Sequence, residues 1–202
     1  VLKNEGGSGF GNCFWLYLAA RCLNPAFVME SGVFMGQSTW FISQACPNAS
    51  LHCFDINFQR LVFKAPRAEY HEFDWSAFTF GPIDAGRSFC FFDDHINQAR
   101  RVREAYERGF RFLLFDDTVP LNKIYADGIP PLPTVAMLTD PRWVPDERIE
   151  WLHRGRKNHY VCKELDTWGA RELIRDYFMF PDVSPVVKYG RSSYLAFVRL
   201  ID

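Results

Sequence analysis

Short apolar runs alternate with helix-like stretches along the first part of the chain, which predicts an α/β fold. The runs are nearly continuous in apolar residues, as is typical of strands buried on both faces of a parallel sheet. Expected strands lie at 26–29, 51–54, 69–72, 88–92 and 110–115, and expected helices at 14–23, 39–45 and 96–108. Gly109 follows the last of these helices, where a C-terminus favours glycine. We therefore expect parallel strands joined by right-handed helical crossovers.

The pattern is less regular elsewhere. Short helices are expected at 58–65 and 121–126, longer ones at 146–154 and 166–178, and an antiparallel hairpin from 185–189 and 193–200. This hairpin would add a reversed strand to the parallel sheet. Prolines are frequent between 118 and 165, which indicates an irregular insertion over the strand ends, where substrate specificity usually resides. A glycine-rich loop and the first helix occupy 1–25, as a lid or as a disordered end.

Composition narrows the class of protein. With 202 residues, 48% of them hydrophobic, the chain can bury one full core, so we expect a single domain over 1–202. A net charge of −1 without blocks of like charge argues against nucleic-acid binding. No apolar run reaches membrane-span length, and no signal peptide is evident.

The six cysteines are scattered, and several lie in apolar runs. We expect reduced thiols and a cytoplasmic protein, although an even number of cysteines leaves disulfides open. The chain does not begin with methionine, so it can be one domain of a longer protein. A homodimer is left open.

The nine residues from Glu30 to Ser38 join an apolar run to a helix through two glycines. Gly32 and Gly36 allow a sharp turn and a close approach to a ligand, and the helix directs free N–H groups toward the turn. Asp55 ends the next strand, where a nucleotide-binding fold places an acid on the ribose hydroxyls. Glu30 would repel a pyrophosphate. The alternative is that the glycines only close a tight loop.

These residues form the pattern E-x-G-x-x-x-G-x-S, which resembles motif I of the class I S-adenosylmethionine-dependent methyltransferases, in the form common among small-molecule O-methyltransferases. The resemblance implies a mostly parallel seven-stranded Rossmann-like sheet with an antiparallel C-terminal strand and helices on both faces. It implies that S-adenosylmethionine contacts Glu30, Gly32, Gly36, Ser38, Asp55, Asp74, Trp75 and Asp93. In this family an acid after the third strand contacts the adenine amino group, and Asp74 stands at that position. The alternative is that Asp74 is a helix N-cap.

Acidic residues follow two further expected strands. Asp93, Asp94 and His95 end the fourth strand, and Asp116 and Asp117 end the fifth. The carboxyl ends of parallel strands meet at one edge of the sheet, so we expect these acids to converge there. Several close carboxylates repel one another unless a cation or protons intervene. Oxygen ligands at this density suit Mg²⁺ best, with Mn²⁺ or Ca²⁺ as alternatives.

The same arrangement resembles the metal site of catechol-type and of macrolide or aminocoumarin sugar O-methyltransferases. The resemblance implies Asp93, Asp116 and Asp117 as metal ligands, with Asp94 as the alternative first ligand. His95 stands where the sugar enzymes place an acidic base. The ion would lower the pKa of a substrate hydroxyl, and His95 would remove its proton, with Asp94 beside it as a second candidate catalytic residue. The alternatives are that Asp94 caps the next helix and that His95 binds a carboxylate for structure alone.

The sequence thus predicts a metal-assisted O-methyltransferase that acts on a sugar, glycan or other small polyhydroxylated acceptor. Two alternatives keep the fold: a metal-dependent hydrolase or hydroxylase-like enzyme of polysaccharide biosynthesis, and a non-catalytic glycan-binding domain. The other four histidines lack ligand spacing in the sequence and are expected to be structural or surface residues: His52, His71, His153 and His159.

Overall fold

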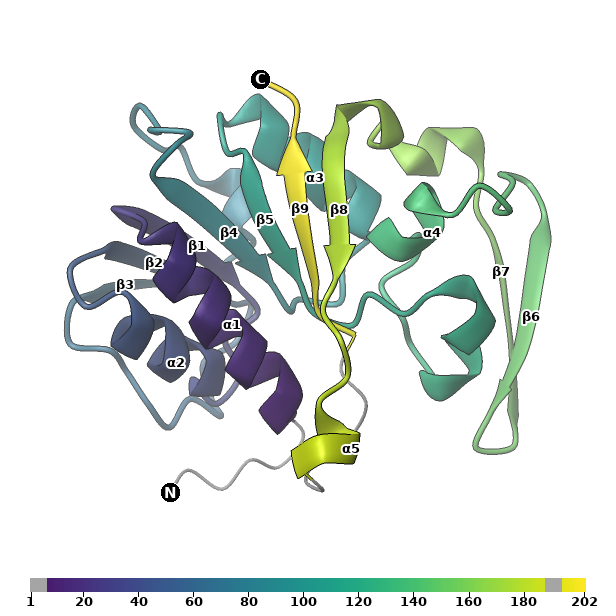
Figure 1. Cartoon of the computed structure of the whole chain (residues 1–202), viewed down its shortest axis with the longest axis horizontal. Helices are drawn as coiled ribbons and strands as arrows, with labels where there is room; N and C mark the ends of the chain where they lie inside the picture. The colour runs from purple at the N-terminus through teal and green to yellow at the C-terminus, as the bar shows by residue number, and fades with distance from the viewer. Residues whose placement is uncertain (1–6, 188–193) are drawn as a thin grey trace.

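A seven-stranded mixed sheet forms the centre of the protein (Figure 1), which a computed structural model describes for residues 7–187 and 194–202. The strand order is β3-β2-β1-β4-β5-β9-β8, and β9 runs antiparallel to both of its neighbours. The strands are β1 (Phe27–Ser31), β2 (Ser50–Phe54), β3 (Ala68–His71), β4 (Ser88–Phe92), β5 (Phe112–Phe115), β8 (Ile174–Met179) and β9 (Ala196–Leu200). The predicted parallel sheet and its single reversed strand are confirmed.

The register of the central strands aligns their carboxyl ends. Ser31 at the end of β1 pairs with Phe54 of β2 and with Phe92 of β4. Phe92 in turn pairs with Phe115 of β5. The residues that follow these four strand ends therefore emerge at the same level of the sheet, which is where an open α/β sheet binds its ligand.

Helices cover both faces of the sheet, as predicted. In Figure 1, α1 (Phe10–Leu23) and α2 (Gln37–Ala45) lie in front of the sheet, and α3 (Gln98–Glu107) lies behind it. Ala20 and Ile42 of the front helices share one core cluster with Val28, and Val102 of α3 shares the other with Met29. Neighbouring residues of β1 thus point to opposite cores, as the pleat requires. The remaining short helices are η1 (Trp75–Ala77), η2 (Leu121–Ala126), α4 (Val135–Thr139), η3 (Glu164–Thr167), η4 (Arg171–Leu173) and α5 (Ser184–Val187).

Helix α3 begins and ends at residues that favour helix termini. The side chain of Asn97 accepts a hydrogen bond from the backbone N–H of Arg100, so Asn97 is the N-cap. Gly109 adopts φ +89° just beyond the helix, a conformation that costs glycine little. Ala99, Val102 and Ala105 are fully buried against the sheet.

The segment 146–154, predicted as a helix, is instead the first half of an antiparallel hairpin. β6 (Arg148–His153) pairs with β7 (Arg156–Val161) in a separate two-stranded sheet, at the right of Figure 1. The turn residues Arg154 and Gly155 both have positive φ, as in the tight turns that match strand twist. Burial along β6 alternates with the period of a strand, and the Trp151 indole donates to the carbonyl of Asp127 at 2.8 Å.

Two other predicted helices are wrong. The helix expected at 166–178 breaks at Trp168 and Gly169, both with positive φ, and its second half becomes strand β8. At 58–65 the chain is not helical: the N–H groups of Val62 and Phe63 bond the carbonyl of Met35, so the segment runs along the start of α2. Pairing with existing elements thus replaces local helix formation in both segments.

The prediction of a C-terminal hairpin was correct for one of its two strands. β9 forms as predicted, but its antiparallel partner is β8 and not 185–189. Residues 184–187 form α5 instead, and 188–193 lie outside the described residues. All six cysteines are free thiols. Across 7–187 and 194–202, no helix combines the length and apolarity that a membrane crossing needs.

Candidate cofactor and metal site

A cavity of about 810 Å³ opens at the carboxyl ends of β1, β2, β4 and β5. Its wall combines the glycine turn after β1, the loops after β2 and β3, the acids after β4 and β5, and the start of α1. The lining residues are Gly7, Ser8, Gly9, Phe10, Asn12, Ser31, Gly32, Phe34, Phe54, Asp55, Ile56, Phe73, Asp74, Asp93, Asp94, His95, Ile96, Arg101, Asp116 and Asp117.

Both glycines of the turn are required by the backbone. Gly32 has φ +91°, and a Cβ there would lie 2.3 Å from the carbonyl oxygen of Asp93. Gly36 has φ +85°, and its Cβ would lie 2.3 Å from the carbonyl oxygen of Phe63. Gly32 lines the cavity, whereas Gly36 is the N-cap of α2 and does not. The turn is therefore packed against two other loops, and only glycine fits at either position.

Asp55 ties the glycine turn to the end of β2. Its Oδ2 accepts hydrogen bonds from the backbone N–H groups of Val33 and Phe34, each at 2.9 Å. Its Oδ1 accepts from Asn57 N at 3.1 Å. A carboxylate offers about four acceptor sites, so Asp55 keeps capacity for hydroxyl donors in the cavity.

Glu30 and Ser38 lie behind the turn and not on the cavity wall. Glu30 is fully buried; its Oε2 accepts from Thr39 Oγ1 at 2.6 Å and from Cys53 Sγ at 3.4 Å. Its Oε1 is buried without a hydrogen-bond partner. Burial raises the pKa of Glu30 to about 7, despite hydrogen bonds from Ser38 and Thr39. A direct role of Glu30 and Ser38 toward a cofactor remains a prediction.

Arg101 of α3 organises the acids on the other side of the cavity. Its side chain is 1% exposed and donates to Asp74 at 2.7 Å, to Asp94 at 2.9 Å and to Glu104 at 2.7 Å. Burial opposes ionisation of Asp74, but the Arg101 hydrogen bonds outweigh it and hold the pKa of Asp74 below its usual value. No pattern in the sequence indicates this role, because an arginine on an amphipathic helix is normally on the solvent face.

Trp75 lies in the core beneath the cavity. It is fully buried, with the guanidinium of Arg108 4.8 Å from its ring centre. Asp74 lines the cavity, and it also caps η1 by accepting from Ser76 N at 2.8 Å. The structure therefore realises the capping alternative for Asp74 and leaves its carboxylate at the cavity wall. Contact of Trp75 with adenine remains a prediction.

The acids after β4 and β5 converge as predicted. Ser8 Oγ lies 3.1 Å from Asp93 Oδ2 and 2.6 Å from Asp116 Oδ2, so it bridges the two carboxylates. Asn12 Nδ2 donates to Asp116 Oδ1. One side-chain atom each of Asp93, His95 and Asp117 lies within 4.8 Å of the other two. The N-terminal loop thus reaches the acids directly, and the glycines before α1 were the only hint of it in the sequence.

Asp94 lines the same cavity, but its hydrogen bonds go to residues outside this group. Its Oδ2 accepts from Ser31 Oγ at 2.6 Å and from Arg101, and its Oδ1 accepts from Ile96 N at 3.1 Å. Burial raises the pKa of Asp94, and Arg101 opposes that shift. Asp94 therefore connects β1, β4 and α3, and its predicted catalytic role stays a prediction.

The electrostatics of the acid group favour a cation. Burial and then repulsion from Asp116 and Asp117 raise the pKa of Asp93 well above its usual value. Burial and repulsion from Asp116 raise the pKa of Asp117 to about 8. Within 7–187 and 194–202, no lysine or arginine lies within 4.0 Å of these three carboxylates. Carboxylate oxygens gathered at one cavity wall without lysine or arginine partners fit a hard divalent ion.

Three non-glycine residues on the cavity wall have left-handed backbone. Phe34, His95 and Asp117 adopt φ of 50°, 55° and 52°. Such residues are uncommon and cluster at functional sites, where the surrounding structure holds them in place. Each follows the end of a central strand, so the strain falls on the edge where the acids meet.

The strand order and the reversed β9 are those of the class I S-adenosylmethionine-dependent methyltransferase fold. No protein-family model and no curated protein matches the sequence. Solved structures match across nearly the whole chain. They include a candidate O-methyltransferase from Klebsiella pneumoniae (TM-score 0.57, 12% identity, 98% of this chain and 83% of that chain).

Two further matches carry a cofactor or its product. The O-methyltransferase from Bacillus cereus in complex with S-adenosylhomocysteine has a TM-score of 0.52 at 12% identity, over 98% of this chain and 84% of that chain. TomG, an O-methyltransferase from Streptomyces achromogenes in complex with S-adenosylmethionine, has a TM-score of 0.52 at 12% identity, over 98% and 83%. At this identity the matches show the fold.

Proposed function

We propose that the protein is an S-adenosylmethionine-dependent O-methyltransferase whose acceptor hydroxyl is activated with the help of a divalent ion. One observation carries the proposal: among residues 7–187 and 194–202, six aspartates and a single arginine line the cavity beside the glycine turn. S-adenosylmethionine carries a positive sulfonium and an ammonium group, which this field attracts. A nucleoside polyphosphate would be repelled by the same carboxylates.

The cavity offers a place for each part of the methyl donor. Asp55 would hold the ribose hydroxyls with the acceptor capacity that its bonds to the turn leave free. Phe34, Ile56 and Phe73 supply apolar wall area beside Asp55 and Asp74, which suits a purine ring with a polar edge. When bound, S-adenosylmethionine supplies the methyl group for transfer to an oxygen.

Asp93, Asp116 and Asp117 would hold the ion, since in the described part of the chain none of them has a lysine or arginine partner, and the imidazole of His95 faces Asp117. A bound ion would lower the pKa of an acceptor hydroxyl and fix its position. Ser8 and Asn12 now occupy Asp116 with hydrogen bonds, so they would have to share or release it. Asp94 is committed to Arg101 and is the weaker choice of ligand.

His95 would be the general base. Its Nδ1 faces Asp117 Oδ2 at 3.4 Å, and its side chain is 56% exposed. Asp117 can orient the ring through Nδ1, which leaves Nε2 to take a proton from an acceptor. We place the acceptor beside His95. We expect a sugar or other polyhydroxylated small molecule, because a chelating ion would bind two neighbouring oxygens.

Calorimetry with S-adenosylmethionine and, as the matched control, ATP tests the cofactor. We expect saturable binding of S-adenosylmethionine and none of ATP; no heat and no thermal shift with millimolar S-adenosylmethionine would overturn the proposal. Methyl transfer to a panel of sugars, catechols and simple alcohols, with Mg²⁺ or with EDTA, then tests the acceptor and the ion. Cofactor binding without transfer to any hydroxyl would favour the hydroxylase-like or glycan-binding alternative.

A further inference from the structure

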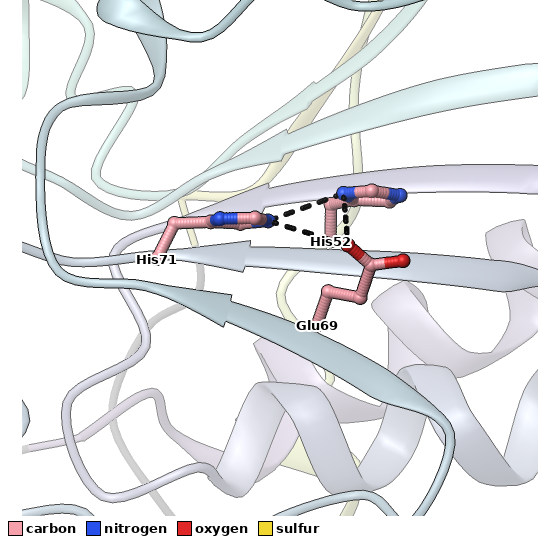
Figure 2. A group of neighbouring side chains, drawn as sticks. All are labelled: His52, Glu69 and His71. Atoms are coloured by element: carbon pink, nitrogen blue, oxygen red, sulfur yellow. Dashed lines mark hydrogen bonds and ion pairs between the residues drawn. The ribbon is translucent and has the colours of Figure 1, made fainter.

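Three side chains with metal-ligating atoms meet at the β3 edge of the sheet, away from the acid group. In the parallel register His52 of β2 pairs with Glu69 of β3, and His71 lies two residues further along β3. Side chains two apart on a strand share a face, so all three project to the same side (Figure 2). His52 and His71 lack ligand spacing in the sequence and were expected to be structural or surface residues; the structure brings them together, because strand pairing joins residues that are distant in sequence.

The separation of the two ring nitrogens is that of a tetrahedral zinc site, and the two rings, with planes 6° apart and centres 5.5 Å apart, would turn from facing each other toward a common ion. His52 Nδ1 and His71 Nε2 are 3.2 Å apart. With Zn–N bonds of about 2.0 Å, tetrahedral ligands are separated by about 3.3 Å. Glu69 Oε2 lies 3.8 Å from the nitrogen of His52 and 4.0 Å from that of His71. The carboxylate therefore needs to move by roughly half an ångström to complete the set.

A hydrogen bond between the two rings explains only part of this arrangement. One N–H can bridge the two nitrogens, but the carboxylate oxygen that faces both of them is beyond hydrogen-bond distance from each. In the described part of the chain, no lysine or arginine lies within 4.0 Å of Glu69. A cation at the common point would satisfy all three groups at once.

Packing holds the imidazoles and leaves the carboxylate mobile. His71 stacks on Phe54 with ring centres 4.5 Å apart, and His52 stacks on Phe27 at 4.9 Å. The Glu69 side chain is 64% exposed on the edge strand, so solvent and ions can reach it.

We propose that His52, Glu69 and His71 bind a zinc ion, with water as the fourth ligand. Imidazole nitrogen suits Zn²⁺, whereas the carboxylates beyond β4 and β5 suit Mg²⁺, so the two sites select different ions. The ion links edge strand β3 to β2. It also steadies the cofactor cavity, because the His71 carbonyl accepts a hydrogen bond from Asp55 N at 3.2 Å. This site does not depend on methyl transfer.

Calorimetric titration of the metal-free full chain with ZnCl₂ tests the proposal. We expect one tight zinc site in the wild type, and affinity reduced by more than about tenfold in Glu69→Gln and in His71→Asn, since even outer-shell changes cost that much. The matched control is His159→Asn, an exposed histidine on β7, which should bind as the wild type does. Equal affinity in all four proteins, or no saturable zinc binding, would overturn the site.

A second measurement needs no variant and covers the case in which a substitution prevents folding. Imidazole nitrogen resonances of the wild type are followed by NMR as ZnCl₂ is added. We expect the signals of His52 and His71 to shift together at one equivalent, with a rise in melting temperature. If His95 responds at one equivalent and His52 and His71 do not, zinc binds at the acid group and the proposal is wrong.

Discussion

His95 and Asp117 face each other from the ends of neighbouring strands, with Nδ1 of the imidazole 3.4 Å from Oδ2 of the carboxylate. Both residues have left-handed φ, and both line the same cavity. If either backbone took ordinary strand geometry, its side chain would move away from the other. The pair is therefore built by the two turns, and it gives the proposed base its orientation.

Replacing the imidazole tests that base. We expect His95→Ala to lower kcat by about 10²- to 10⁴-fold, the usual contribution of a general base, with S-adenosylmethionine affinity unchanged. The measurement is kcat against pH together with calorimetry of the cofactor. His159→Ala on β7 is the control. A near-normal rate at high pH in the variant would mean that the ion alone suffices or that the base lies elsewhere.

Asp116→Asn tests the metal ligands. The amide keeps the shape but removes the charge, so we expect the Mg²⁺ concentration needed for half-maximal turnover to rise by at least tenfold, about 1.4 kcal/mol. Asp84→Asn, in an exposed loop, should change nothing. Turnover and metal dependence that both survive in Asp116→Asn would show that the ion binds elsewhere, even if the cofactor binds as proposed.

Gly32→Ala should destabilise the protein by at least about 2 kcal/mol, because left-handed backbone costs alanine roughly 1–2 kcal/mol and the added Cβ must displace the Asp93 carbonyl. Urea unfolding measures the loss. In Gly81→Ala the Cβ meets nothing within 4 Å, and we expect a change within about 0.5 kcal/mol. Equal stability of the two variants would contradict the packing of the turn.

Removing Arg101 leaves buried carboxylates without their partner. We expect Arg101→Met to lose about 3–5 kcal/mol of unfolding free energy, as for a broken buried ion pair. Arg103→Met, on the exposed side of the same helix, should lose less than about 1 kcal/mol. Chemical denaturation at neutral pH compares the two. Similar losses would mean that Arg101 is not the organising cation of this wall.

Glu30 predicts a pH dependence of stability. Its pKa is about 7 in the folded protein, against roughly 4.3 in an unfolded chain. Folding therefore favours the protonated form: this stabilisation is complete below about pH 4 and is lost as pH rises through 7, on the order of 3 kcal/mol. We expect Glu30→Gln, which mimics the neutral acid, to match the wild type near pH 4 and to exceed it at pH 8. Parallel unfolding curves from pH 4 to 8 would contradict this.

The central fold was predictable because its signals are local. Continuous apolar runs such as 88–92 have few alternatives to a buried strand, and parallel strands bring their carboxyl ends to one edge. The sequence alone therefore places Asp93 and Asp116 at the same edge. The glycine turn was predictable for the same reason. Gly32 and Gly36 both have positive φ, a backbone conformation that favours glycine, so the residue type itself indicates the turn.

The rest depended on pairing across the chain. The segment 146–154 has no local feature that separates a half-exposed strand from a short helix. It is a strand because it pairs with β7. His52 and His71 meet through the register of an edge strand, which sequence spacing does not reveal. Ser8 reaches Asp116 across more than a hundred residues. The same holds for Arg101, whose burial depends on the loop that carries Asp74.

The left-handed turns at His95 and Asp117 restrict how these positions can evolve. Histidine, asparagine, aspartate and glycine tolerate such backbone, whereas β-branched residues do not. Folding alone would therefore favour this small set of residues, even in a homologue without the proposed activity, although Phe34 shows that other types can be held there. Invariance at 95 and 117 in an alignment would thus report backbone geometry as well as chemistry. Exchange of Asp117 for asparagine or glycine, with the fold intact, would be the signature of a descendant that no longer needs the charge.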